Sequence, residues 1–174
     1  ILKDYELSFD QLKEIKEYCD SKSILFMCTP FDPQSADQVN SLGTEIFKVS
    51  SADLTNLYLL DKLSSLKKPL ILSTGMSSYH EIDKTVEFLE TKNCTFALLH
   101  CVSSYPVNYG DANLKRIEKL RDRYKTLVGY SGHDDGVSLS IAAVALGAVI
   151  VEKHITLDRN LRGPDHKFSR LPED

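Results

Sequence analysis

Two histidines in the last third of the chain are placed where they could hold a metal ion or a substrate carbonyl. His133 ends one expected strand and His154 ends the next, with one helix between them. In a parallel strand–helix layout, the carboxyl ends of neighbouring strands lie on the same rim, so both imidazoles can reach one ligand. Two ligands are too few for a closed structural zinc site, but they suit a catalytic ion with open positions. From spacing alone, a shared ion and two unrelated histidines are equal alternatives.

A glutamate and a lysine add charge to this rim. Glu152 precedes His154 by two residues, so both side chains face the same side of a strand. We expect Glu152 to orient a metal-binding histidine or to act as a base, and a structural ion pair with Lys48 is the alternative. Lys48 lies within an apolar run, where an ammonium group needs an anionic partner such as a phosphate or a carboxylate. A lysine that snorkels to the rim and a Schiff-base lysine are the other two interpretations.

Hydroxyl-bearing residues follow several of the apolar runs. Ser51 and residues 73–75 (Ser-Thr-Gly) could donate hydrogen bonds to phosphate oxygens, although an ordinary strand-ending turn is the favoured interpretation of 73–75 alone. Further polar residues stand in the same position after other runs: Thr29, Ser103, Tyr105 and Ser131. The segments before the runs carry mostly solvating residues, such as Lys67 and Lys68. This asymmetry is typical of a (β/α)8 barrel, whose active site lies at the carboxyl ends of the strands.

Six apolar runs alternate with six amphipathic segments and must position these side chains. The runs predict buried parallel strands that start near residues 24, 45, 69, 95, 126 and 148. Helices are expected over residues 8–20, 32–43, 54–66, 79–91, 112–124 and 137–146. Strict alternation predicts an α/β fold, and the polar rim predicts a TIM-type (β/α)8 barrel, here an incomplete portion with about six parallel strands. No Gly-x-Gly-x-x-Gly follows any run, which argues against a dinucleotide-binding fold.

Composition excludes several classes of partner. The chain has 174 residues, which suits one domain, and its net charge of −4 gives no basic field for nucleic acid or an anionic membrane. No apolar run approaches the ~20 residues of a membrane helix. The four cysteines form no C-x-x-C pair, and Cys28 and Cys101 are expected to be small core residues. We therefore expect a cytoplasmic protein, and the N-terminus, without a signal-peptide pattern or a starting methionine, is expected to be the middle of a longer chain.

Seven short blocks occur in the order found in one enzyme family. They span residues 29–32, 47–51, 72–76, 99–106, 129–133, 152–158 and 163–166. Together they resemble the sialic acid synthase family, that is, N-acetylneuraminate synthase and related nonulosonic acid synthases. The resemblance implies that residues 1–174 form a partial barrel domain holding strands three to eight. The first two barrel strands and the C-terminal antifreeze-like domain of the family would then be absent.

The chemistry implied by the resemblance is the condensation of phosphoenolpyruvate with an open-chain N-acetylated aminosugar, such as N-acetylmannosamine, with release of phosphate. A divalent metal, Mn²⁺ with Mg²⁺ or Zn²⁺ as alternatives, would lie on His133 and His154 and act as a Lewis acid on the sugar aldehyde. Asp165 would contact the sugar hydroxyls and Tyr105 would line the pocket. Phosphoenolpyruvate would be bound by five residues: Thr29, Lys48, Ser51, Ser73 and Ser131.

Three positions depart from the family pattern. Ser50 stands where the family commonly has glycine, so the backbone is expected to differ there. Ser103 stands where the family commonly has asparagine, which weakens one substrate contact. Asp53, expected to assist proton transfer, stands where a longer glutamate is frequent. The expected catalytic set is therefore Asp53, Glu152, His133 and His154, and a homodimer is implied for the full-length enzyme.

Two other function classes stay open at this point. A chain without two barrel strands would expose strand edges and could be a non-catalytic or ligand-binding remnant that self-associates. Another metal-dependent aldolase on the same barrel, using pyruvate instead of phosphoenolpyruvate, is the second alternative.

Overall fold

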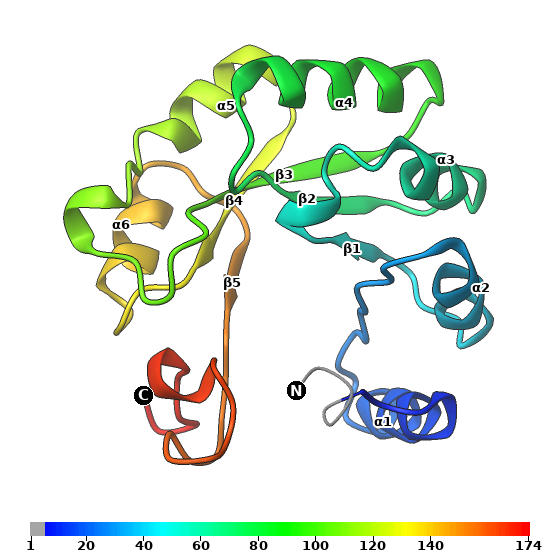
Figure 1. The fold of residues 1–174 in the computed structure, drawn as a ribbon, viewed down its shortest axis with the longest axis horizontal. Coiled ribbons are helices and arrows are strands. Elements are labelled where there is room, and N and C mark those ends of the chain that lie inside the picture. Colours follow the sequence, from blue (N-terminus) through cyan, green and yellow to red (C-terminus); the bar gives the residue numbers. More distant parts are fainter. Residues whose placement is uncertain (1–5) are drawn as a thin grey trace.

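The computed structural model describes residues 6–174 and is built on one parallel sheet. Its strands lie in chain order, each paired in parallel with the next. They are β1 (Phe47–Val49), β2 (Leu70–Ser73), β3 (Phe96–Cys101), β4 (Leu127–Gly132) and β5 (Val151–Lys153). The sheet curls, with its helices on the convex side (Figure 1). This confirms the expected α/β architecture as a portion of a TIM-type barrel.

The helices fall where the sequence periodicity predicts them. They are α1 (Phe9–Ser21), α2 (Pro33–Ser41), α3 (Leu57–Ser65), α4 (Tyr79–Thr91), α5 (Arg116–Tyr124) and α6 (Ser138–Ala145). Several begin at a side-chain cap, and Ser8 with Gln11 forms the predicted capping box of α1. Ser78 and Glu81 form a second capping box at α4. These two caps fix the residues at which α1 and α4 begin.

Side-chain alternation along the strands divides the sheet into two faces. In β1 and β2 every second residue, such as Leu70 and Leu72 of β2, is fully buried in the hydrophobic core beneath the helices. The intervening residues, such as Lys48 and Ser73, therefore face the concave side. The core thus lies between the sheet and the helices, and the concave side is left for polar side chains. Among the described residues, no helix is long and apolar enough to cross a bilayer.

The prediction of a strand at residues 24–28 was wrong. This segment makes one parallel bridge, Cys28 with Phe47, so the sheet has five strands rather than six. Ile24 and Leu25 are 60% and 51% exposed, whereas a buried strand was expected. The segment has a partner on one side only, and Pro30, which has no N–H group, cannot extend the ladder beyond the bridge.

Candidate active site on the concave face

A cavity of about 550 Å³ opens on the concave side of the sheet, at the carboxyl ends of the strands. Ten of the twelve residues expected at the site line it, and Asp53 and Asp165 do not. The ten are Thr29, Lys48, Ser51, Ser73, Ser103, Tyr105, Ser131, His133, Glu152 and His154. Residues from loops and strands more than a hundred positions apart therefore share one rim, as a parallel barrel requires.

Lys48 is the buried cation of this cavity. Its Nζ donates hydrogen bonds to Ser73 Oγ at 2.8 Å and to the Val49 carbonyl at 3.0 Å. It also lies 3.6 Å from Glu152 Oε2, so the structural ion pair weighed from the sequence is present. Burial lowers the pKa of Lys48, and the carboxylate of Glu152 partly opposes that shift. The other oxygen of Glu152 accepts a hydrogen bond from Ser131 Oγ at 2.7 Å.

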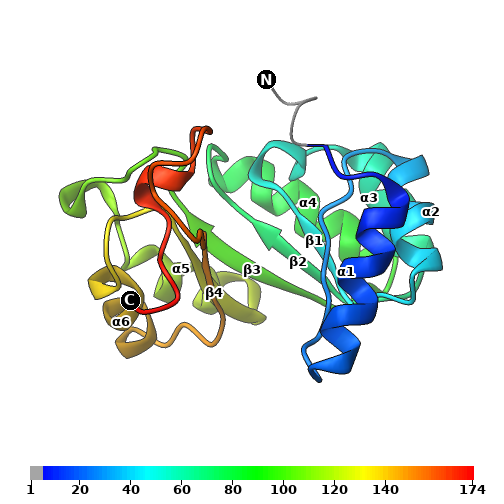
Figure 2. The ribbon, with the colours of Figure 1, turned by 90° about the horizontal axis from the view of Figure 1, so that it is seen from below.

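This ion pair also shows that the sheet is strongly curved. Lys48 lies on β1 and Glu152 on β5, the first and last strands of the sheet. Neighbouring strands are about 4.8 Å apart, so a flat sheet would hold these two strands roughly 19 Å apart. Two side chains cannot cover that span, and the ion pair therefore requires a strongly curled sheet, as Figure 1 shows. Figure 2 looks from below onto the concave side of this sheet.

The two histidines face each other at the rim. The ring centroids of His133 and His154 are 5.4 Å apart, with an interplanar angle of 67°. His133 Nδ1 lies 3.0 Å from the carbonyl oxygen of Val102, which can only accept, so Nδ1 carries the proton and Nε2 keeps its lone pair. His154 Nδ1 lies 3.7 Å from Asp165 Oδ2, which favours the same tautomer. Both rings thus have an Nε2 available for a ligand.

This donor set fits a divalent ion that also binds substrate. An imidazole nitrogen binds such an ion at roughly 2.0–2.1 Å, so two rings on one ion have centroids about 5 Å apart. Among residues 6–174, no group of three or more His, Cys, Asp or Glu side chains is arranged to hold an ion. His133 and His154 would therefore supply two positions and leave the remainder to water and substrate, as in a catalytic site.

The two imidazoles differ in proton affinity. Burial lowers the pKa of His154, although the carboxylate of Asp165 acts in the opposite direction. Burial also acts to lower the pKa of His133, but the Cys101 thiol and the Val102 carbonyl outweigh it, so the pKa is raised. His154 therefore stays neutral to a lower pH than His133 does.

Two site residues were missed by the sequence reasoning. Cys101, expected in the core, lines the cavity with its Sγ 3.8 Å from His133 Nδ1. The alternation of β3 could have placed it, because Leu98 faces the core and position 101 has the opposite parity. Phe168 packs on both histidines, with ring centroids 5.0 Å from His154 and 6.3 Å from His133. It follows the last strand in an irregular segment, where no periodicity signals its position.

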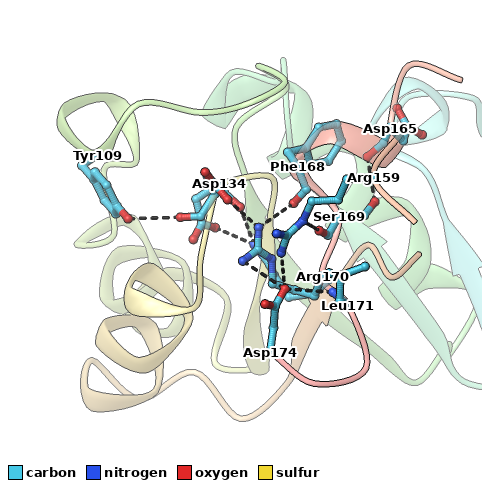
Figure 3. Close-up of polar contacts among 11 residues, drawn as sticks. Tyr109, Asp134, Arg159, Asp165, Phe168, Ser169, Arg170, Leu171 and Asp174 are labelled. Atoms are coloured by element: carbon cyan, nitrogen blue, oxygen red, sulfur yellow. Dashed lines mark hydrogen bonds and ion pairs between the residues drawn. The ribbon is translucent and has the colours of Figure 1, made fainter. Parts of the chain in front are cut away.

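The C-terminal segment brings Phe168 back to the rim. Arg170 forms a parallel bridge with Ile155, and its backbone N–H donates to the His154 carbonyl at 2.8 Å. Its guanidinium pairs with Asp135, and Arg159 pairs with Asp174 nearby (Figure 3). These contacts fix the loop that carries Asp165, which stands beside His154 and outside the cavity wall.

Asp53 lies at the edge of the site. Its carboxylate accepts hydrogen bonds from Ser50 Oγ at 2.7 Å and from Asn56 Nδ2 at 3.2 Å, within a short 3-10 turn at Ser51–Asp53. Its neighbour Ser51 does line the cavity and accepts a hydrogen bond from the Gly75 N–H at 3.1 Å. A role for Asp53 in proton transfer stays a prediction.

Comparison with known proteins decides the family. The profile of the NeuB family matches residues 1–174. The chain belongs to the NeuB family. It is 44% identical over 172 residues to the N,N'-diacetyllegionaminic acid synthase of Campylobacter jejuni, covering 97% of this chain and 52% of that protein. It is 39% identical to the N-acetylneuraminate-9-phosphate synthase of Drosophila melanogaster, covering 99% of this chain and 47% of that protein. This NeuB chain thus spans about half the length of the curated relatives it matches.

The solved structures agree with this NeuB assignment. The N-acetylneuraminic acid (sialic acid) synthetase of Leptospira borgpetersenii, crystallised in complex with citrate, matches with a TM-score of 0.95. The two chains are 41% identical, and the match covers 98% of this chain and 60% of that one. A truncated 3-deoxy-D-arabino-heptulosonate 7-phosphate synthase of Thermotoga maritima matches with a TM-score of 0.83 at 19% identity, which shows a shared fold alone. The predicted family and the partial TIM-type barrel are both confirmed.

Proposed function

We propose that this chain carries the active-site rim of a nonulosonic acid synthase that condenses phosphoenolpyruvate with an N-acetylated aminosugar. The observation that carries the proposal is one cavity in which a buried lysine, strand-end hydroxyls and two facing imidazoles converge. The printed names of its relatives, a diacetyllegionaminic acid synthase and an N-acetylneuraminate-9-phosphate synthase, support the same product class.

In this proposal Lys48 binds an anionic group of phosphoenolpyruvate. A buried ammonium group with hydroxyls on either side suits a phosphate or a carboxylate, because each oxygen then meets a donor. Ser73 Oγ stands 2.8 Å from Nζ, and Ser51 is held in the same cavity by the Gly75 N–H. Thr29 and Ser131 complete the hydroxyl-bearing wall.

His133 and His154 would hold a divalent ion, with Mn²⁺ preferred, which polarises the sugar aldehyde when it is bound. Phosphoenolpyruvate C3 then attacks the aldehyde carbon, water adds at C2, and the tetrahedral intermediate loses phosphate by C–O cleavage. Glu152 lies between Lys48 and Ser131, where its carboxylate can accept a proton at the reacting end of the pocket. Tyr105, with its ring centroid 4.1 Å from that of His133, covers one side of the imidazole.

The test is an assay of phosphate release and product mass with phosphoenolpyruvate, Mn²⁺ and a panel of N-acetylated aminosugars. The panel contains N-acetylmannosamine, its 6-phosphate and a bacillosamine-type sugar. We expect turnover with one of them, a loss of about 10²–10³-fold in Lys48→Met, and no change in Lys84→Met, which replaces an exposed lysine of α4. Condensation with pyruvate instead of phosphoenolpyruvate would contradict the proposal and favour a different aldolase.

A non-catalytic, ligand-binding protein, the alternative left open by the sequence, is the second candidate. Mn²⁺ binding without turnover on any sugar of the panel would support it. Both candidates therefore predict Mn²⁺ binding, and product formation distinguishes between them.

A further inference from the structure

A second cavity, of about 380 Å³, lies on the other side of the sheet from the proposed active site. It is enclosed by the end of β3, the first residue of α4 and the loop that leads into α5. None of the residues expected at the active site lines it. Its lining residues are Tyr79, His100, Val102, Asn113, Leu114, Lys115, Arg116 and Lys119.

A buried histidine in the wall of this cavity has a hydrogen-bond partner for one of its two ring nitrogens. His100 is 1% exposed, and its Nε2 lies 2.7 Å from the Ala112 carbonyl oxygen. Because a carbonyl only accepts, Nε2 carries the proton and Nδ1 is left as an acceptor. Nδ1 is buried and has no hydrogen-bond partner in the part of the chain that the structure describes. A buried acceptor without a partner is unfavourable, and a ligand hydroxyl would supply the missing hydrogen bond.

The remaining wall is cationic. Arg116 lies over the Tyr79 ring at 4.8 Å and donates from Nη2 to the Ser77 carbonyl at 2.8 Å, while its buried Nε–H has no partner within residues 6–174. Lys115 and Lys119 are exposed and form no ion pair with any described residue. No carboxylate is among the lining residues. The basic side chains therefore have no internal anion to neutralise them at this cavity.

The start of α5 adds a further positive element. This helix has nine residues, and its first turn has no side-chain cap. The backbone N–H groups of Arg116 and Ile117 already donate to the Asn113 and Leu114 carbonyls, so this helix end favours an anion through its dipole alone. Lys115 and Arg116 stand at this end, and Lys119 lies one turn later on the same helix face.

We propose that this cavity binds a small phosphomonoester that carries a free hydroxyl group. Its phosphate would lie against Arg116, Lys115, Lys119 and the first turn of α5. Its hydroxyl would donate to His100 Nδ1. A dianion matches three cations better than a single carboxylate does, and the volume is within the range of small-molecule sites.

Titration calorimetry on the whole chain tests this site with glycerol 3-phosphate, which combines both features. Inorganic phosphate and glycerol are the probes that carry one feature each. We expect glycerol 3-phosphate to bind more tightly than phosphate, and glycerol not to bind. The exposed pair Lys115→Ala/Lys119→Ala should weaken the affinity by about tenfold or more, and Lys84→Ala, an exposed lysine of α4 outside the cavity, should leave it unchanged.

A third comparison separates this cavity from the concave face. Lys48→Met should retain the binding, because Lys48 lies in the other cavity. His100→Leu should bind phosphate and glycerol 3-phosphate equally, since the acceptor for the hydroxyl is gone. The proposal is overturned if glycerol 3-phosphate gives no heat at millimolar concentrations, if the lysine pair has no effect, or if Lys48→Met abolishes binding.

Discussion

Asp165 stands behind His154 and favours the tautomer in which Nε2 faces the cavity. Its Oδ2 lies 3.7 Å from Nδ1, an arrangement in which a carboxylate raises the basicity of a metal-binding imidazole. Asp165→Asn should therefore weaken Mn²⁺ binding by about tenfold in the absence of any sugar. Titration calorimetry with Mn²⁺ measures this, and the absence of sugar separates this role from the expected contact with sugar hydroxyls. Equal affinities in Asp165→Asn and in Asp10→Asn, on the exposed start of α1, would contradict it.

At the residue scale, much of the site was predictable because strands impose a strict alternation. The parity of β1, β2 and β4 brings Lys48, Ser73 and Ser131 to one face, as expected. The exact partners were less accessible to sequence reasoning. Glu152 had two open interpretations, and only the curl of the sheet decides that it reaches Lys48. Phe168 reaches the histidines through a tertiary bridge that has no local sequence signal.

Gly129 permits β4 to pack closely on its neighbours. A Cβ atom there would lie 2.5 Å from the Ile150 carbonyl oxygen and 2.6 Å from Leu99 Cδ2, and the backbone atom cannot move aside cheaply. We expect Gly129→Ala to lower the free energy of unfolding by about 1–3 kcal/mol, as overpacking does. Urea denaturation measures this. Gly110→Ala is the matched control, because a Cβ atom at Gly110 would meet nothing within 4 Å.

Asp83 joins α4 to α5. Arg123 donates to its two oxygens at 2.7 and 2.6 Å, and Tyr124 OH donates at 2.8 Å. The hydrogen bonds from Arg123 and Tyr124 hold the pKa of Asp83 below its ordinary value. A depressed folded-state pKa contributes stability that is present above the unfolded pKa of about 3.9 and is lost as the pH falls through the folded pKa.

Asp83→Asn should therefore unfold at a lower temperature than the unaltered chain at pH 7. The difference between the two melting temperatures should shrink as the pH falls below about 4, because the unaltered carboxylate is then protonated. Thermal unfolding followed by circular dichroism across this range measures it. A difference that stays constant between neutral and acidic pH would show that the carboxylate charge is not the cause.

Among the elements, the helices were the most predictable because caps and periodicity agree in them. The strands were located correctly from residue 45 onward, although each begins one to three residues later than expected. The exception is residues 24–28, whose composition is that of a buried strand. The apolar composition of a segment indicates that it tends to be buried. Whether it forms a full strand depends on how many neighbouring strands it can hydrogen-bond to, and this segment lies at the edge of the sheet.

For the whole molecule, the Lys48–Glu152 pair connects the two ends of the curled sheet. A double-mutant cycle with Lys48→Met and Glu152→Gln should give a coupling of about 1 kcal/mol, since Lys48 is buried but the Glu152 side chain is 36% exposed and partly screened. Urea denaturation of the four proteins supplies the cycle. Strictly additive effects would show that the strands hold their curvature without this contact.

The same pair would compete with any anion at the proposed binding site. A phosphate or carboxylate that approaches Lys48 would meet the carboxylate of Glu152, which already lies 3.6 Å from Nζ, so binding would proceed by exchange rather than by simple addition. The incoming group would then neutralise the ammonium, and Glu152 would keep its hydrogen bond from Ser131. Arrival of one reactant would thereby prepare a base for the next step, and the two ends of the sheet would lose the tie between them at the same moment.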